Sequence, residues 1–486
     1  MIKRIRTLTL SAQQSLVRLA CTHTIMGLLI IMSQTWLNPH AAQASEVEAQ
    51  SSDTDPGLQL DTFDAVWNQV STQYFDYSRI ESDWLQARED YRPRAANASR
   101  SELRDLMNDM LEVVGESHFL VLPPTQISIP STPSNQDGDP SIDSDTNDNR
   151  ADSDAERSTG LGVRLIDGAL IVDRVGEVNV DLIQPGWALV AIGDQVLQPV
   201  IEETLAIEET SARNRATLFL EASANGLIGL QSDADPIELT LLDGNDDEQR
   251  VTPLTFPDPV NVFQLGNLPG LEFTYRAQTL SEGDECIGRM TFSSWVPELM
   301  DRFEETRATL FACQGLIIDL RGNLGGVLTT MMPLTSHMIN EMVLLGQLKR
   351  EDGRIDFRAF PRLVADDGTR LTPFDGPVAI LIDSLSASTS EMFSAGMQSL
   401  GRARVFGARS PGMALPAQML PLPNGDRLMY AFADYIDGQG RRIEGVGVTP
   451  DEVVPLRRSE LLQGQDPVIE AASRWLTEQA QQGASE

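Results

Sequence analysis

A serine-rich segment that joins an apolar run to an amphipathic run is the first place where this sequence could do chemistry. It reads LIDSLSASTSEMFSAG over 381–396, with four serines between 384 and 390. A serine hydroxyl attacks a carbonyl carbon only when a neighbouring base takes its proton. Ser388 and Glu391 also have the spacing of a helix capping box, so Ser388 fits either a helix cap or a nucleophile. The two roles are compatible, because the free N–H groups at a helix N-terminus favour developing negative charge.

A second segment, LIIDLRGNLGG at 316–326, reads as a buried strand that ends in a charged turn and two glycines. Glycines at the end of a strand let backbone N–H groups approach a ligand closely. Such groups stabilise the oxyanion that forms during acyl transfer. The same pattern also fits a turn that leads into a helix, so the residues alone leave both interpretations open.

The region around these two segments alternates between strands and helices. The apolar runs of strand length are GRMTFSSW, QGLIIDLRG, GPVAILIDS and ARVFGAR. Helical periodicity begins at Pro297, Val327 and Ser388. This alternation predicts an α/β core with a mostly parallel sheet over 257–480.

Two different segments precede that core. Residues 58–124 show apolar residues at the helical period and are expected to form an N-terminal helical region. Residues 125–157 include STPSNQDGDPSIDSDTNDNRADSDAER, whose one large aliphatic residue is Ile142. Such a segment buries too little apolar surface to offset its ordering entropy, so we expect an acidic, disordered linker.

The segment 158–256 is expected to be β-rich. STGLGVRLIDGALIVDRV reads as a glycine-rich turn with two short strands, and DLIQPGWALVAIGDQVL follows. Together they resemble a PDZ domain, in which a glycine-rich loop captures the terminal carboxylate of a peptide that adds as a strand. The resemblance assigns peptide binding to Gly160, Leu161, Gly162 and Val163. An ordinary β-rich spacer domain is the alternative.

Composition limits the partners and the compartment. The formal net charge is −34, so binding to nucleic acid or to an anionic membrane surface through charge is not expected. Residues 1–44 contain four basic residues, an acid-free apolar run and a small-x-small end, which predicts a signal peptide cleaved after Ala44. A retained membrane anchor is the alternative.

The cysteines that would remain after cleavage are Cys286 and Cys313. An exported location permits a disulfide between them, and two unpaired buried thiols are the alternative. Two cysteines and the few histidines do not make a zinc site, so no metal is expected.

Three segments behind the PDZ-like region resemble the tail-specific, or C-terminal processing, serine protease superfamily. They are GLIIDLRGNLGG, SASTSEMFSAGMQSLGRARVFG and IEGVGVTPD, in that order. The resemblance implies a ClpP/crotonase-like α/β catalytic core that acts on polypeptides without metal, nucleotide or other cofactor. It assigns the nucleophile to Ser388 and the oxyanion-hole amides to Gly326 and Thr389.

The sequence departs from the best-known branch of that superfamily at the base. Those enzymes place a lysine about two dozen residues after the serine, where this chain has GARSPGMALP and Met413. The chain has two lysines, Lys3 in the signal and Lys349 in a polar turn that is expected to be exposed. A Ser-Lys dyad is therefore not expected.

The tricorn-core branch of the same superfamily offers a different base. Its Ser-His pair matches Ser117 and His118 in VVGESHFLVLP, and its glutamate matches Glu444 in RRIEGVGVTPD. In such a tetrad His118 takes the proton of Ser388, and Ser117, supported by Glu444, orients the histidine. His337 also follows a serine, but it lies in an apolar helix and is expected to be a core histidine.

The leader-like segment predicts export, and the two resemblances together imply a serine peptidase that hydrolyses extended or C-terminally presented polypeptides through an acyl-enzyme. The first rival is a catalytically inactive, PDZ-type peptide-binding protein that retains the protease fold. The second is an esterase or transpeptidase with the same acyl-enzyme chemistry. The oligomeric state is left open.

Overall fold

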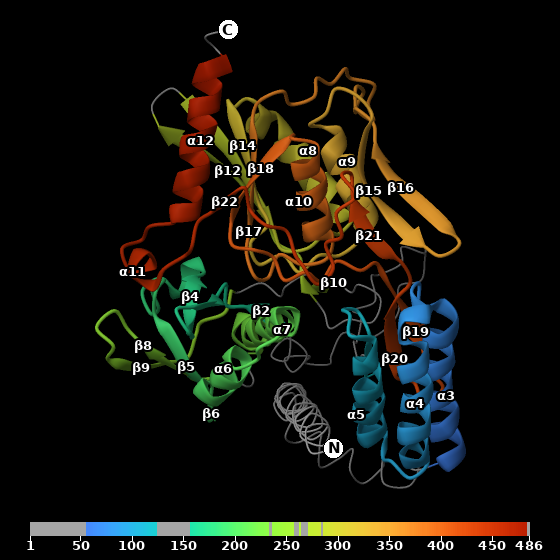
Figure 1. Ribbon diagram of the computed structural model, residues 1–486. Helices are drawn as coiled ribbons and strands as arrows, with labels where there is room; N and C mark the ends of the chain where they lie inside the picture. Colours follow the sequence, from blue (N-terminus) through green and yellow to red (C-terminus); the bar gives the residue numbers. More distant parts are fainter. Residues whose placement is uncertain are drawn as a thin grey trace, which may run out of the picture.

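The structure is a computed structural model that describes residues 55–123, 156–232, 236–256, 262–263, 271–282 and 285–483 (Figure 1). The predicted signal peptide lies outside these residues, as does the predicted acidic linker up to residue 155. Across the described ranges, no helix combines the length and apolar character needed to cross a membrane.

A six-stranded sheet forms the centre of the largest part of the molecule, in the order β12-β13-β14-β17-β18-β22. Its strands are β12 (Tyr275–Glu282), β13 (Glu285–Phe292), β14 (Gly315–Asp319), β17 (Val378–Ile382), β18 (Ala403–Gly407) and β22 (Glu452–Val453). β12 is antiparallel to β13, and every later pair in the order is parallel. The mostly parallel sheet predicted for this region is therefore present.

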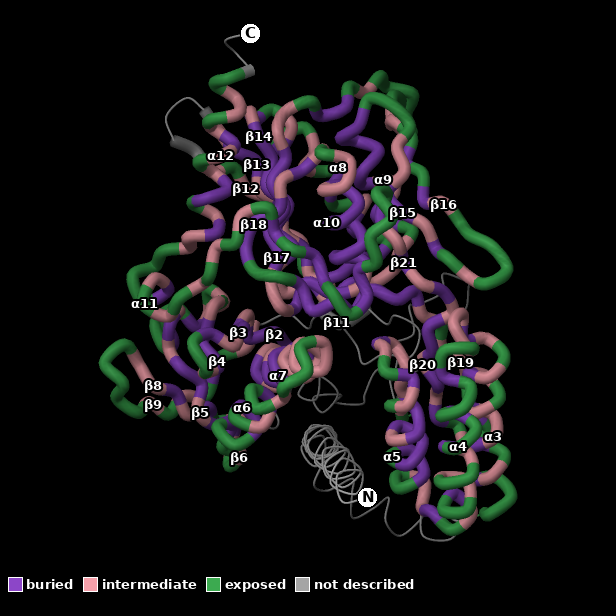
Figure 2. Tube along the Cα trace, in the orientation of Figure 1, coloured by how far each residue is buried: buried purple, intermediate pink, exposed green. Residues whose placement is uncertain are grey.

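Helices cover both faces of this sheet. Every residue of β14 and β17 is buried, as expected for Val/Ile/Leu-rich strands with two covered faces (Figure 2). Leu316 and Ile318 of β14 pack in the same apolar cluster as α8 (Glu298–Phe311) and α10 (Thr389–Ser399). Ile317, between them, packs instead with α12 (Pro467–Gly483), because successive side chains of a strand point to opposite faces.

The N-terminal helical region is joined to the C-terminal half of the chain. It consists of α3 (Pro56–Gln73), α4 (Tyr77–Ala95), α5 (Arg100–Leu111) and η1 (Glu112–Val114). The chain then forms β1 (Leu120–Leu122), which pairs with β20 (Arg427–Ala431), and β20 pairs with β19 (Ala417–Pro421). The last residues of the range predicted as helical are therefore a strand, because hydrogen bonds to β20 outweigh local preference.

Residues 156–251 form a separate β-rich module with two helices. Its sheet has the order β3-β4-β5-β8-β9, with β6 paired to β5, and a small sheet joins β2 to β7. The bounds are β2 (Glu156–Ser158), β3 (Gly162–Ile166), β4 (Ala169–Arg174), η2 (Glu177–Asn179), β5 (Ala188–Ile192), β6 (Gln195–Val196), α6 (Gln198–Leu205), α7 (Thr210–Gly229), β7 (Leu230–Ser232), β8 (Leu239–Leu242) and β9 (Glu248–Val251). The end of the predicted linker, Glu156 and Arg157, thus belongs to a strand.

The remaining elements complete the core. A three-stranded sheet has the order β16 (Gly353–Ala359), β15 (Val343–Arg350), β21 (Asp434–Asp437). The others are β10 (Val262–Phe263), β11 (Leu271–Glu272), η3 (Leu328–Thr330), α9 (Met331–Ser336) and α11 (Arg458–Leu461). Cys286 and Cys313 form a disulfide, which decides between the two alternatives that the sequence left open.

Candidate active site

Ser388 lies in the turn between β17 and α10, at the carboxyl end of a central parallel strand. It is the residue before the first turn of α10, with φ 54° and ψ −118°. A non-glycine residue with positive φ is strained, and such strain persists where the surrounding structure holds it. Here the Ser388 N–H donates to the Met413 carbonyl oxygen at 2.9 Å and to Glu391 Oε2 at 3.2 Å.

The glycine pair Gly325 and Gly326, in the loop after the neighbouring strand β14, lies against Ser388. A Cβ on Gly325 would come within 2.6 Å of the Ser388 Cβ, so a side chain at 325 would displace the serine. Gly326 has φ 145°, and a Cβ there would meet the Trp295 carbonyl oxygen. Among the described residues, neither the Gly326 N–H nor the Thr389 N–H has a hydrogen-bond acceptor. Two N–H groups without acceptors thus lie close to Ser388.

Ser117, His118 and Glu444 form a hydrogen-bonded group. Ser117 Oγ lies 2.7 Å from His118 Nδ1 and donates to Glu444 Oε2 at 2.9 Å. The Ser117 N–H donates to Glu444 Oε1 at 2.8 Å. Because the single hydroxyl proton of Ser117 is directed to Glu444, Ser117 Oγ accepts from Nδ1–H. A neutral imidazole protonated on Nδ1 leaves Nε2 free to act as a base.

One peptide group connects Ser388 to this group. The carbonyl oxygen of Met413 accepts from the Ser388 N–H, and the next N–H, of Ala414, donates to Glu444 Oε2 at 2.8 Å. A short chain of hydrogen bonds therefore runs from Ser388 through Glu444 and Ser117 to His118. No hydrogen bond joins the His118 imidazole directly to the Ser388 hydroxyl, both of which belong to the described part of the chain.

Burial sets the protonation of this group. Desolvation lowers the pKa of His118 from 6.5 to about 4, so the imidazole is neutral at physiological pH. Desolvation also raises the pKa of Glu444, against the pull of the N–H groups of Ser117 and Ala414 and of the Ser117 hydroxyl. In Glu391, burial likewise raises the pKa, while the Ser410 hydroxyl and the N–H groups of Gly412 and Met413 lower it by stabilising the carboxylate.

Glu391 has more contacts with this site than its predicted role as a helix cap requires. Its carboxylate accepts hydrogen bonds from Ser410 Oγ and from the N–H groups of Gly412 and Met413 as well as from Ser388. The capping-box spacing identified only its contact with Ser388. Its contacts with 410–413 could not be read from local spacing.

The other serines of the segment stabilise the turn. Ser386 Oγ donates to the Leu320 carbonyl oxygen and accepts from the Asp383 N–H. Ser390 Oγ donates to the Asn323 carbonyl oxygen and accepts from Trp295 Nε1. Their hydroxyls are therefore occupied in joining the two loops that carry Ser388 and the glycine pair.

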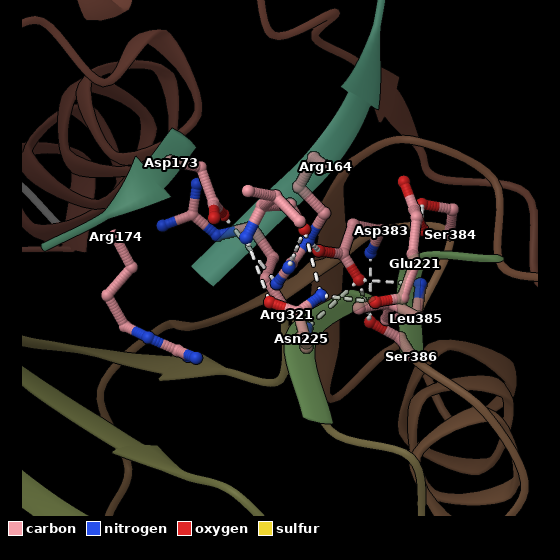
Figure 3. Close-up of polar contacts among 12 residues, drawn as sticks. Arg164, Asp173, Arg174, Glu221, Asn225, Arg321, Asp383, Ser384, Leu385 and Ser386 are labelled. Carbon is pink, nitrogen blue, oxygen red and sulfur yellow. Dashed lines mark hydrogen bonds and ion pairs between the residues drawn. The ribbon is translucent and has the colours of Figure 1, made fainter. Parts of the chain in front are cut away.

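The β-rich module docks on the loop that leads to Ser388 (Figure 3). Arg164 of β3 donates from Nε to Asp383 Oδ2 at 2.6 Å, and Ser384 Oγ donates to Glu221 Oε2 of α7 at 2.7 Å. Next to these polar contacts, Leu218 of α7 packs in one apolar cluster with Leu385, Ala387 and Met413. The position of the missing lysine is therefore filled by a methionine that packs against α7.

The predicted peptide-binding residues have internal partners. The N–H of Gly160 donates to Ser158 Oγ, and that of Leu161 donates to Thr159 Oγ1. Val163, on the edge strand β3, exchanges two hydrogen bonds with the Asn225 side chain of α7. The Leu165 N–H donates to Glu221 Oε1 at 2.6 Å. Side chains of α7 thus occupy the edge of β3 along which a peptide strand would add.

His337 and Lys349, which were not expected to act as the base, have no contact with this site. His337 follows α9, is 2 % exposed, and stacks edge-on against Phe303, as expected for a core histidine. Lys349 is exposed as predicted, although it lies in strand β15 instead of a turn.

Two ranges of this chain match models of known protein families. Residues 287–454 match the model of peptidase family S41, and residues 60–112 match the tricorn protease C1 domain. The carboxy-terminal-processing protease of Bartonella bacilliformis is 31% identical over 156 residues, which are 32% of this chain and 34% of that protein. The carboxyl-terminal-processing protease of Picosynechococcus sp. is 28% identical over 139 residues, 29% of this chain and 31% of that protein. The alignments thus span about a third of the length of these curated relatives.

Solved structures show the same fold over most of the chain. The photosystem II D1 C-terminal processing protease has a TM-score of 0.51 and 17% identity, covering 86% of this chain and 97% of its own. Mature CPAF complexed with lactacystin has a TM-score of 0.52 and 12% identity, covering 88% and 98%. Residues 287–454, which carry Ser388, the glycine pair and Glu444, are therefore the part of the chain that is similar to peptidase family S41, whose members are serine-type peptidases.

Proposed function

We propose that this protein is an exported serine peptidase that hydrolyses peptide bonds through an acyl-enzyme on Ser388, with His118 as the general base. The observation that carries the proposal is the Met413–Ala414 peptide group. It binds the Ser388 N–H on one side and Glu444, the partner of Ser117, on the other. This chain has Met413 where the Ser-Lys enzymes have their lysine. The hydrogen bonds from Ser388 to Glu444 and Ser117 support the histidine mechanism in its place.

In the first step, His118 Nε2 accepts the proton of the Ser388 hydroxyl while Oγ attacks the carbonyl carbon of the substrate. The N–H groups of Gly326 and Thr389, which have no acceptor among the described residues, stabilise the oxyanion of the tetrahedral intermediate. The Nδ1–H bond to Ser117, backed by Glu444, stabilises the imidazolium that forms. This step requires His118 Nε2 to come within hydrogen-bond distance of Ser388 Oγ when substrate binds, because catalytic hydrogen bonds often form fully only in the substrate complex.

In the second step, the imidazolium gives its proton to the leaving amine, and the acyl group remains on Ser388. Water then attacks the ester carbonyl as His118 takes a proton from it, and the imidazolium gives that proton to Ser388 Oγ when the carboxylic acid product leaves. Each proton that leaves an oxygen therefore has a named acceptor, and no metal or nucleotide takes part.

The proposed substrates are extended or C-terminally presented polypeptides. The glycine-rich turn of Gly160–Val163 would bind the peptide terminus, as in a PDZ domain. A peptide that added to β3 would have to displace Asn225 and Glu221 from the strand edge. Peptide binding at the module is thus proposed as a competition with α7.

Export is supported by the leader-like residues 1–44 and by the Cys286–Cys313 disulfide, which persists in oxidising compartments. N-terminal sequencing of the protein isolated from the cell envelope or the medium should begin at Ser45. An N-terminus at residue 1 would contradict cleavage.

A fluorophosphonate probe tests the nucleophile. The wild-type protein should form an adduct that mass spectrometry locates on Ser388, and Ser388→Ala should abolish it. Ser399→Ala is the matched control, because its hydroxyl donates within the far end of the same helix, α10, and its loss should leave labelling unchanged.

The same experiment separates the rivals. A folded wild-type protein that takes no label and binds peptides would be the inactive peptide-binding protein. Labelling with turnover of ester substrates only would indicate an esterase, whereas release of peptide fragments supports the peptidase.

A further inference from the structure

We infer that Glu391 is a positioning residue that holds Ser388 in register with the Glu444–Ser117–His118 group by binding the segment 410–413. This inference rests on the proposed function, because it concerns the alignment of the same nucleophile. Glu391 has no exposed surface and lies three residues after Ser388 on the first turn of α10.

All four hydrogen-bond partners of Glu391 are donors. Oε1 accepts from Ser410 Oγ at 2.5 Å and from the Gly412 N–H at 2.8 Å. Oε2 accepts from the N–H groups of Met413 at 2.8 Å and Ser388 at 3.2 Å. The hydroxyl of Ser410 is itself oriented as a donor, because its oxygen accepts from the Val448 N–H. A carboxylate is the side chain that satisfies four donors at this place.

Two buried carboxylates divide the consecutive N–H groups of this segment. Glu391 binds those of Gly412 and Met413, and Glu444 binds that of Ala414. Glu391 and Glu444 together therefore fix the position of residues 410–414, which we call the strap. Because the Met413 carbonyl oxygen accepts from Ser388, a shift of the strap would shift the nucleophile relative to His118.

The packing leaves this strap little freedom. A Cβ on Gly412 would come within 2.8 Å of the N–H groups of Val446 and Gly447. The Gly445 N–H donates to the Gly412 carbonyl oxygen at 2.8 Å. The strap thus lies directly on the loop that carries Glu444, and Glu391 ties both to the turn of Ser388.

Glu391→Gln tests the inference, since it keeps the size of the side chain but turns an NH2 group toward two of the donors. A misplacement of about 1 Å costs roughly 100-fold in rate, so kcat and the rate of fluorophosphonate labelling should fall by about that factor. The KM for a peptide substrate should stay within about twofold of wild type, because Glu391 is buried behind the serine. Hydrogen exchange at the N–H groups of 412–414 should become faster.

Asp437→Asn is the control, because Asp437 is a buried carboxylate that accepts from the N–H groups of Gln439 and Arg441 in a turn that follows β21. It should lower the melting temperature without changing the labelling rate of the folded protein. If Glu391→Gln does not fold, Ser410→Ala removes one donor to Oε1 and should reduce labelling by a smaller factor.

The outcomes distinguish this inference from the proposed function. Wild-type labelling at Ser388 together with unchanged labelling of folded Glu391→Gln would overturn the inference and leave the peptidase intact. Absence of wild-type labelling would overturn the proposed function. In that case unchanged hydrogen exchange at 412–414 in Glu391→Gln would overturn the inference as well.

Discussion

At the scale of single residues, the environment of His118 determines how this site could work. The histidine has a positive φ of 64°, which is a strained backbone conformation, and its Nδ1 contacts Ser117 Oγ. Glu444 accepts from two N–H groups and from the Ser117 hydroxyl, so the proton on Nδ1 is assigned by the hydrogen bonds around it. The residue types predicted the group, and the contacts leave Nε2 as the nitrogen that the proposed base would use.

The pH dependence should follow the lowered pKa of His118. A histidine that acts as a base works in its neutral form, and burial moves its pKa from 6.5 to about 4. Activity should therefore hold from neutral pH down to about 5 and fall as the pH passes through 4. The measurement is kcat/KM against pH, together with an NMR titration of His118 in Ser388→Ala. A titration near pH 6.5 would contradict the burial effect.

The two histidines of the described residues should respond differently to removal. His118→Ala should lower kcat by about 10²–10⁴-fold, the usual contribution of a general base. His337→Ala should lower the free energy of unfolding by about 1–3 kcal/mol, because the ring is buried against Phe303, while kcat per folded molecule stays the same. Equal loss of kcat in both folded variants would show that His118 is not the base.

At the scale of elements, α7 links the β-rich module to the catalytic turn. Its side chains bind the edge of β3 through Asn225 and Glu221, and its apolar face packs on Leu385 and Met413. This helix was not among the elements predicted from the sequence, although Leu220, Ala224 and Ile228 have helical spacing. The helix lies between the β-rich module and the catalytic turn, and most of its residues are half-buried. Its apolar residues therefore do not form a clear stripe in the sequence.

The ion pair between Arg164 and Asp383 should stabilise this docking. Arg164 is buried, and its guanidinium also lies within 3.6 Å of Asp173. Arg164→Met removes the buried cation that pairs with Asp383 and Asp173, so the free energy of unfolding should fall by about 3 kcal/mol. Calorimetry measures this change, and the module should unfold at a lower temperature than the core.

Arg250→Met is the matched variant, since Arg250 pairs with Glu238 and Glu248 at an exposed site of the same module. Exposed pairs contribute little, so its melting curve should match that of the wild type. Equal effects of the two substitutions would argue against a stabilising role for the Arg164 contact.

At the scale of the whole molecule, the site depends on contacts between the N-terminal helical region and the C-terminal half of the chain. The pairing of β1 with β20 fixes the strand that follows His118, and Arg104 of α5 binds the buried Asp426 next to β20. The Cys286–Cys313 disulfide holds the start of β13 to the end of α8. Long-range contacts of these kinds keep His118 and Ser388 in one framework.

Removing the disulfide should weaken that framework. The bridge closes a loop with a sequence separation of 27, and loops of this size give about 3 kcal/mol in the chain-entropy estimate. The double variant Cys286→Ser, Cys313→Ser should unfold at lower urea concentration by a corresponding amount. If the oxidised wild type and the double variant unfolded at the same urea concentration, the estimate would be wrong.

The sequence by itself determined the local features of this protein. The apolar runs became β14, β17 and β18, the capping spacing placed Ser388 at the start of α10, and His337 entered the core. These features depend on the periodicity of neighbouring residues, which is written in the chain. Tertiary structure decided that one peptide group, Met413–Ala414, joins Ser388 to Glu444, that Glu391 binds four donors, and that α7 covers the edge of β3. These contacts join residues that are separated by 21 positions in Glu391–Gly412, 30 in Ala414–Glu444 and 62 in Val163–Asn225, and hydrogen bonds at such separations are specified by the packed fold and not by local spacing.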